Sequence, residues 1–110
     1  MIISRKQGKY EITNISTGKT IVVDDFYGFG IGDVSIVRKD GKQGVVNLNG
    51  TLVINTTNEL VLVYDEDIIV CRKGNGKYIL RNNKGKKLSK LIFESAEEAI
   101  ACGAYLKGIF

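Results

Sequence analysis

Three short basic motifs are the residues of this chain best suited to chemistry, and that chemistry is the binding of negatively charged groups. Each motif has the pattern Arg-Lys-x-Gly-Lys, and they occupy positions 5–9, 38–42 and 72–77, the third with one inserted residue. Their first arginines are 33 and 34 residues apart, which is the spacing of a structural repeat. Lysine and arginine bind phosphate and carboxylate groups, so superposed repeats predict a basic rim that attracts nucleic acid or an acidic protein. The simpler interpretation is that lysines at turns keep hairpins soluble and prevent edge-to-edge pairing.

Charge is concentrated towards the end of the chain. The net charge is only +4, yet residues 72–90 hold eight basic residues and no acidic one. The hairpin 82–87 is expected to add charge near the third motif, while an acidic turn, 65–67, lies just upstream. The predicted rim consists of Arg5, Lys6, Lys9, Arg38, Lys39, Lys42, Arg72, Lys73 and Lys77, with Tyr10 and Tyr78 available for stacking.

The residues needed for common catalytic centres are missing. The chain has no histidine, which excludes a Cys-His pair and a serine triad and removes the commonest metal ligand. Asp65 and Asp67 are two residues apart and could share one face of a strand, but no further ligand spacing supports a cation site. We therefore expect neither an enzyme nor a cofactor.

Short β-branched runs separated by glycine turns surround each basic motif. A second glycine follows each motif lysine after eight or nine residues, at Gly18, Gly50 and Gly85. The runs between these turns are rich in Val, Ile, Thr and Tyr, which favour strands, and Gly, Asn and Asp suit tight hairpins. Each repeat is predicted to be three antiparallel strands, the last of them at 20–23, 52–54 and 88–93. One repeat has too small a core to stand alone, so the three must share apolar faces.

The last segment changes to helical periodicity. Ser95-Ala96-Glu97-Glu98 has the pattern of a capping box, and Ala99, Ile100, Gly103 and Leu106 recur at helical spacing before Gly108. We interpret this helix as a lid over the open end of the repeat core, the alternative being a helix that docks a partner. The fold prediction is all-β with one C-terminal α-helix, as a compact antiparallel sandwich or a partly closed barrel. One domain covers 1–110, with repeats at about 3–35, 36–69 and 70–93 and the helix at about 95–107.

Composition indicates a globular chain in a reducing compartment. Hydrophobic residues make up 44% and charged residues 25%, and no apolar run is long enough to span a membrane. The N-terminus becomes charged too early for a signal peptide, so we expect a cytoplasmic protein without membrane contact. Cys71 and Cys102 lie in apolar stretches and are interpreted as two buried thiols, the alternative being a bridge between them.

Each repeat has the same order of features: a strand, a glycine-lysine turn, a second strand and an asparagine-glycine turn. This order resembles the WG-repeat family of bacterial and phage proteins, also called KWG repeats. The best match is Val37-Arg38-Lys39-Asp40-Gly41-Lys42-Gln43-Gly44-Val45-Val46-Asn47-Leu48-Asn49-Gly50-Thr51-Leu52-Val53-Ile54, and the similarity extends over about 3–90. The family tryptophan is replaced by Tyr10, Gln43 and Tyr78, and the glycine after it remains only as Gly44. The resemblance implies β-rich repeats that act as interaction modules and implies no reaction.

Three hypotheses for function follow. The first is a small non-enzymatic binding module whose partner is another protein; the second is direct binding of nucleic acid along the basic rim. The third is a small phage or mobile-element inhibitor of a host nuclease or defence complex. An exposed edge strand could also pair two copies into a homo-oligomer. The candidate binding residues are Arg72, Lys73, Lys77, Tyr78, Arg81, Lys84, Lys86, Lys87, Asp65, Glu66 and Asp67.

Overall fold

Three antiparallel sheets follow one another along the chain and end at a helix. The computed structural model describes residues 1–108; the other two residues of the predicted domain lie outside the described part. The N-terminal sheet has the strand order β1-β2-β3, the central sheet β4-β5-β6-β7 and the C-terminal sheet β10-β9-β8. The elements are β1 (Ile2–Lys6), β2 (Lys9–Thr13), β3 (Thr20–Val23), β4 (Asp25–Phe26), a 3-10 turn (Ile31–Asp33), β5 (Val34–Lys39), β6 (Lys42–Asn47), β7 (Leu52–Asn58), β8 (Leu60–Asp65), β9 (Ile68–Arg72), β10 (Tyr78–Arg81) and α1 (Ala96–Lys107).

The charged turns are tight hairpins, as the sequence predicts. In the first two repeats the turn residues Gln7-Gly8 and Asp40-Gly41 all have positive φ, between 53° and 80°. Two consecutive left-handed residues make a type I′ turn, whose twist matches that of the flanking strands. The third turn accommodates its inserted residue with a hydrogen bond of 2.9 Å from the Gly76 amide to the Lys73 carbonyl.

An asparagine opens the second turn of every repeat, and this gives the strongest structural evidence that the three units are equivalent. The side-chain oxygens of Asn14, Asn47 and Asn82 each accept hydrogen bonds from two backbone amides of the turn that follows. The carbonyl of each asparagine also accepts from the amide of the turn glycine, at 2.7 to 3.0 Å. Asparagine stabilises such turns because its side chain mimics a backbone acceptor.

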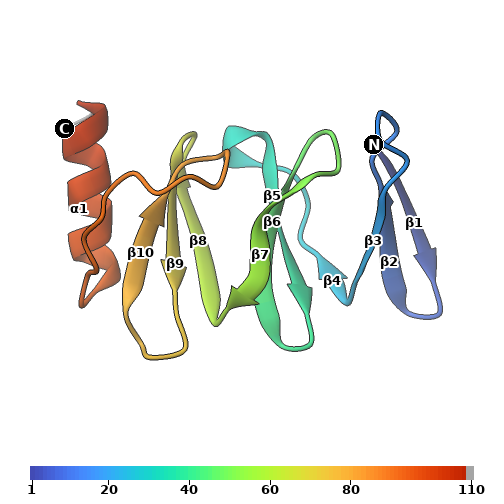
Figure 1. The fold of residues 1–110 in the computed structure, drawn as a ribbon, viewed down its shortest axis with the longest axis horizontal. Coiled ribbons are helices and arrows are strands. Elements are labelled where there is room, and N and C mark those ends of the chain that lie inside the picture. Colours follow the sequence, from blue (N-terminus) through green and yellow to red (C-terminus); the bar gives the residue numbers. More distant parts are fainter. Residues whose placement is uncertain (109–110) are drawn as a thin grey trace.

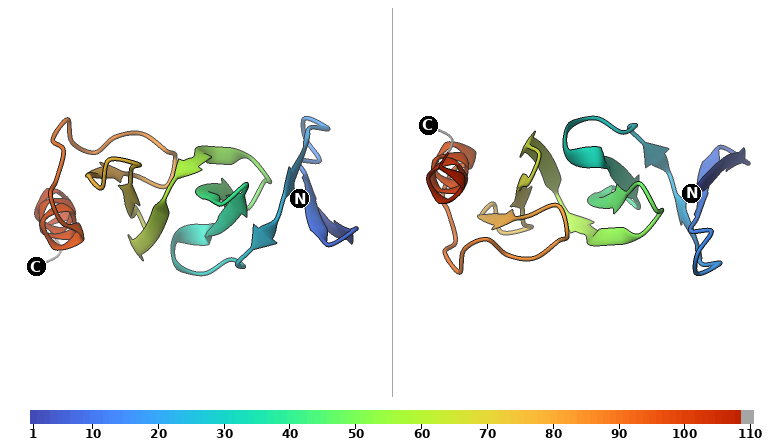
Figure 2. Two further views of the ribbon diagram at one scale, coloured as in Figure 1. Left: turned by 90° about the horizontal axis from the view of Figure 1, so that it is seen from below. Right: turned by 90° about the horizontal axis from the view of Figure 1, so that it is seen from above.

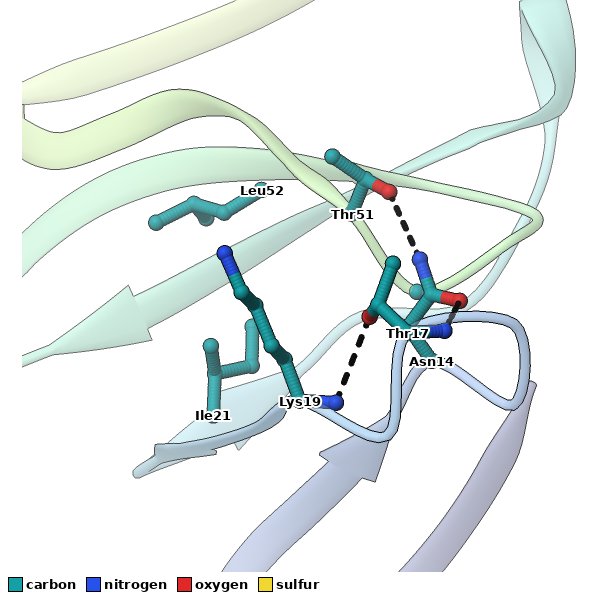
Figure 3. A pocket seen from close by; sticks show the side chains of 7 residues that line it. Asn14, Thr17, Lys19, Ile21, Thr51 and Leu52 are labelled. Atoms are coloured by element: carbon teal, nitrogen blue, oxygen red, sulfur yellow. Dashed lines mark hydrogen bonds between the residues drawn. The ribbon is translucent and has the colours of Figure 1, made fainter.

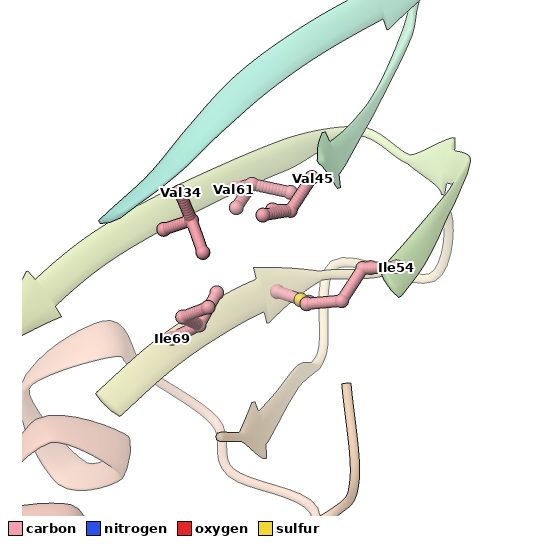
Figure 4. Close-up of a cluster of buried hydrophobic side chains, with 6 residues drawn as sticks. Val34, Val45, Ile54, Val61 and Ile69 are labelled. Atoms are coloured by element: carbon pink, nitrogen blue, oxygen red, sulfur yellow. The ribbon is translucent and has the colours of Figure 1, made fainter. Parts of the chain in front are cut away.

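Three buried clusters join the three sheets and the helix in series. The first lies between the N-terminal and central sheets and contains Ile12, Val23, Val37 and Val46. The second, between the central and C-terminal sheets, contains Val34, Val45, Ile54, Val61, Ile69 and Cys71, and Figure 4 shows these side chains pointing towards one another. The third lies under α1 and contains Ile68, Val70, Leu80, Phe93 and Ala99. Strand β9 alternates between the second and third clusters, which explains its continuous apolar sequence.

The stack is elongated and open. Its extents are 40 × 27 × 19 Å, and the sheets follow each other along the longest axis with α1 at one end (Figures 1 and 2). The sheets do not close into a barrel, so that alternative is excluded, and the mostly β fold with one C-terminal helix is confirmed. No helix in the described part of the chain is long and apolar enough to cross a membrane.

Several details of the predicted repeat are wrong. The central sheet has four strands, because the additional strand β4 pairs with β5. In the C-terminal sheet an additional strand, β8, pairs with β9 in the equivalent position. The predicted strand 88–93 is reduced to two bridges, Arg81 with Lys87 and Tyr78 with Phe93. The predicted repeat bounds at 35/36 and 69/70 fall inside β5 and β9, so the sheet rather than the sequence repeat is the packing unit.

The C-terminal helix begins and ends close to its predicted positions. Ser95 caps it by accepting from the Glu98 amide at 3.2 Å, and Gly108 ends it with a φ of 67°. Ala99 and Gly103 are buried against β9 and β10, so the helix covers the end of the core. Leu106 was predicted on the buried face, but its side chain is 51% exposed because the helix has already passed beyond the core at that point.

Candidate binding surfaces

The three charged turns lie along one edge of the stack. Figure 1 shows the β1–β2, β5–β6 and β9–β10 turns together at the lower edge, while the asparagine turns lie at the upper edge. The predicted gathering of the three motifs on one rim therefore agrees with the arrangement of the strands. We call this the basic edge, defined by residues 5–9, 38–42 and 72–77.

Acidic residues neutralise part of the basic edge. The Lys9 ammonium lies 2.5 Å from Oδ1 of Asp24, and the other oxygen of that carboxylate accepts from the Asp40 amide at 2.8 Å. The hydrogen bond and charge of Asp24 raise the pKa of Lys9, and the hydrogen bond of Lys9 lowers that of Asp24. Arg38 donates from Nε, at 2.7 Å, and from a terminal nitrogen to one oxygen of Asp25. These contacts hold Asp24 against β2 and the β5–β6 turn, and Asp25 of β4 against β5.

Lysines of the third motif also form contacts within the protein. Lys77 lies 2.5 Å from a carboxylate oxygen of Glu94, just before α1. Lys73 donates to Oδ1 of Asn58 at 2.8 Å, on the last residue of β7. Among the exposed motif cations, Lys9 is paired with Asp24 and Arg5 lies over the Tyr10 ring, while Lys6, Lys39, Lys42 and Arg72 are exposed away from these contacts. The edge is therefore a mixture of paired and exposed cations.

Neither tyrosine of the predicted stacking surface is placed for stacking. The Tyr10 ring packs against the first cluster and carries the Arg5 guanidinium 5.1 Å from its centre, a cation–π contact. Tyr78 is half-buried, packs on the third cluster and pairs with Phe93 through backbone hydrogen bonds of 2.9 Å. Both rings are half-buried and pack against the edge of the core instead.

The basic hairpin 82–87 lies at the opposite edge from the third motif, which corrects the sequence prediction. Strand β10 runs between them, so the hairpin emerges beside the acidic β8–β9 turn, where the Asn83 amide donates to Asp67 at 2.8 Å. Lys84, Lys86 and Lys87 are exposed there, and Arg81 donates to the Gly85 carbonyl at 2.8 Å. The predicted site residues thus separate into two groups at opposite edges.

The acidic turn forms one wall of a surface cavity of about 350 Å³. Asp65, Glu66 and Asp67 line it together with Asn83 and Lys107. Partial burial acts to raise the pKa of Asp67, but the Asn83 amide and the Lys107 ammonium outweigh it and the pKa is lowered. No group of three or more metal-ligating side chains occurs within residues 1–108. The carboxylate of Asp67 therefore serves as a structural acceptor.

A second cavity of about 290 Å³ opens between the N-terminal and central sheets (Figure 3). Ile21 and Leu52 form its apolar wall, and Lys19 reaches over it. The Asn14 side chain crosses from one sheet to the other and donates to Thr51 at 2.9 Å. Asn14 therefore caps its own turn and also ties the two sheets together.

An apolar stripe on β8 is the surface feature that the sequence prediction missed. Leu60, Leu62 and Tyr64 alternate along the strand and are 47%, 42% and 45% exposed. Leu60 and Leu62 lie on the face of the C-terminal sheet that α1 covers, and Tyr64 follows them at a shift in the register. The helix packs over β9 and β10 instead of β8. The signal in the sequence was the continuous apolar run 60–64, because five consecutive apolar residues in a strand place apolar side chains on both faces of the sheet.

The two cysteines are free thiols on opposite faces of the C-terminal sheet. Cys71 is fully buried in the second cluster, while Cys102 is half-buried beside the third. Burial raises the pKa of Cys71, against the opposing charges of Arg81 and Lys73. The predicted buried thiols are therefore confirmed for Cys71 and partly so for Cys102.

No protein-family model matches this chain, and neither a curated protein nor a solved structure does so.

Proposed function

We propose that this chain is a non-enzymatic binding module whose partner is a protein, and that the β8 stripe of Leu60, Leu62 and Tyr64 is its contact surface. The exposed apolar stripe is the observation that carries the proposal. Large side chains in a row on a rigid strand are costly to leave in water and mark interaction surfaces more often than scattered ones do. The resemblance to WG repeats, a prediction from sequence, points in the same direction.

Charged groups at the two ends of the stripe would steer the partner. Arg72 is the cross-strand neighbour of Leu60, and Asp65 and Glu66 follow Tyr64. An apolar centre between charges of opposite sign gives a partner one preferred orientation, because charges at the rim affect encounter and register more than affinity. A complementary surface would carry an acid near Arg72 and a base near the 65–66 turn.

Site-specific crosslinking tests this proposal. A photoreactive phenylalanine analogue replaces Tyr64, and a matched control replaces Tyr27, which is 56% exposed elsewhere on the surface. We expect a discrete partner to be crosslinked from position 64 alone. With that partner purified, Leu62→Asp should weaken binding at least about tenfold, equivalent to about 1.4 kcal/mol. Equal crosslinking from both positions, or unchanged affinity in a folded Leu62→Asp variant, would refute the proposal.

Nucleic-acid binding along the basic edge is the second candidate. Its support is the alignment of the three charged turns at one edge of the stack (Figure 1). It is the weaker candidate because Lys9, Arg38 and Lys77 are paired with carboxylates and both tyrosines pack in the core. Lys6, Lys39, Lys42 and Arg72 would have to supply the phosphate contacts.

A further inference from the structure

A small polar cavity lies between the central and C-terminal sheets, next to the second cluster. Its volume is about 130 Å³, and its polar lining comes from Asn55, Thr57 and Asn58 of β7 and from Lys73 and Arg81. Two of these side chains are cations, and none of the described residues that line the cavity is acidic. A pair of partly buried positive charges without a counter-charge is unfavourable, because desolvation is not offset by attraction.

Arg81 is held in place but incompletely satisfied. One terminal nitrogen donates to the Gly85 carbonyl at 2.8 Å, while the Nε atom is buried and has no hydrogen-bond partner within the described part of the chain. A guanidinium carries five N–H donors and no acceptor, and each buried donor without a partner costs free energy. In native proteins such a donor usually meets an ordered water or an ion.

Lys73 is fixed by a buried asparagine. Asn58 is 1% exposed, and its amide nitrogen donates to the carbonyls of Gln43 and Asn55, both at 3.1 Å. The side-chain oxygen of Asn58 is thereby oriented as an acceptor for Lys73 at 2.8 Å. This neutral acceptor uses one of the three ammonium donors and leaves the positive charge uncompensated.

The two cations also converge near the same buried atom. The charges of Arg81 and Lys73 both act on the Cys71 thiol, which lies in the second cluster beside the cavity. The backbone of β7 and the Asn82–Lys86 hairpin are in close contact here, since a Cβ added to Gly85 would collide with the Val53 carbonyl oxygen. The hairpin that accepts from Arg81 is therefore packed directly on β7, the strand that supplies most of the cavity lining.

We propose that this cavity binds a free inorganic oxyanion of the phosphate or sulfate class, held by Arg81 and Lys73. An arginine fork and a lysine together match the charge and several oxygens of such an ion. The cavity is well below the ~300 Å³ at which drug-sized pockets begin. It corresponds to about four water volumes, at ~30 Å³ each, which suits a single tetrahedral ion. Binding would link β7 to the C-terminal sheet at the point where the two sheets meet.

Titration of the isotope-labelled protein with inorganic phosphate, at constant ionic strength and against chloride, tests the proposal. We expect saturable shifts of the backbone amide signals of Thr57, Lys73, Arg81 and Gly85, and little response to chloride. Arg81→Gln and Lys73→Gln should each weaken phosphate binding at least tenfold. Lys84→Gln and Lys86→Gln make the same charge change on exposed side chains and should alter binding less than twofold.

One further variant, Arg81→Lys, together with Lys73→Gln keeps the test decisive if Arg81→Gln does not fold. Arg81→Lys retains the charge but loses the Nε donor and the fork, so it should also weaken binding. Lys73→Gln acts in a turn and leaves the β10 strand intact. Shifts that do not saturate, that chloride reproduces, or that persist unchanged in both Lys73→Gln and Arg81→Lys would overturn the assignment.

Discussion

Lys107, in the last turn of α1, places its ammonium 2.9 Å from Oδ2 of Asp67 in the β8–β9 turn. The two residues are forty positions apart in the chain, so this ion pair fastens the end of the helix to the sheet that it covers. The other oxygen of the same carboxylate accepts from the Asn83 amide. One side chain thus joins the helix, the β8–β9 turn and the basic hairpin.

Removal of the Asp67 charge is expected to make stability depend less on pH. The folded state lowers the pKa of this carboxyl below its usual value of 3.8, so the folded protein binds fewer protons there than the unfolded chain. Its contribution is therefore complete above about pH 5 and is lost as the pH falls through the folded-state pKa. Asp67→Asn should destabilise the protein by about 1 kcal/mol at pH 7, with the gap closing below about pH 4. Urea unfolding at several pH values measures the difference in stability between the wild type and Asp67→Asn, with Glu66→Gln as the control. A difference that stays constant with pH would contradict the role given to the Asp67 carboxylate.

A larger side chain at Gly103 should displace α1 from the C-terminal sheet. A Cβ added there would lie 2.9 Å from Cγ2 of Ile68, which is fully buried. Gly103→Leu should therefore lower the free energy of unfolding by about 2 to 3 kcal/mol through overpacking. Ala101→Leu, on the exposed side of the same helix, should change it by less than about 0.5 kcal/mol. Equal denaturant midpoints for the two variants would show that the helix does not pack as described.

The hairpin 82–87 lies at the edge opposite the three charged turns, so its lysines should contribute little to nucleic-acid binding along the basic edge. Fluorescence anisotropy with labelled duplex DNA should show only weak binding, which falls steeply as salt is raised. Four exposed cations would give a log–log salt slope of about −4 at most. Lys39→Glu with Lys42→Glu should abolish that binding, whereas Lys84→Glu with Lys86→Glu, at the opposite edge, should affect it much less. An equal loss from both pairs would mean that the basic edge has no special role.

Thiol labelling should distinguish the two cysteines. Cys102 is half-buried on the helix and should react with an aromatic disulfide reagent in the folded protein. Cys71 is buried and its pKa is raised, so little reactive thiolate is available until the chain unfolds. One thiol should therefore react quickly and one only in denaturant, and Cys102→Ser should remove the fast phase. Two fast thiols would show that the second cluster opens readily.

The sequence was sufficient for the hairpins because their determinants are local. The pairs Gln7-Gly8 and Asp40-Gly41 dictate the turn type, and Ser95 with Glu98 determines where the helix begins. The repeat interval placed the charged turns on one edge, since equivalent strands in stacked sheets run in the same direction. The prediction of three sheet-forming units with a terminal helix followed from these local features.

Long-range pairing is what the sequence did not reveal. Strand β8 was assumed to belong to the second repeat, but it pairs with β9 across the two-residue turn at Glu66 and Asp67 and so joins the third sheet. The hairpin 82–87 was placed near the third motif because the two are close in sequence. A strand of only four residues, β10, carries it to the opposite edge. The pairing of cations with Asp24, Asp25 and Glu94 was equally hidden, because each partner lies at least thirteen residues away.

The serial stacking of the sheets has a consequence for unfolding. Two of the buried clusters join one sheet to the next, and the third joins the C-terminal sheet to α1. The N-terminal sheet can therefore open without disrupting the cluster beneath α1. All five residues of β1 are exposed, and no strand in the described part of the chain occupies the position beside it that β4 and β8 take in the other sheets. Local opening should therefore begin at this end. Amide hydrogen exchange would then be fastest in β1 and β2 and slowest in β9, which is buried on both faces, so that one chain carries a gradient of stability along its length.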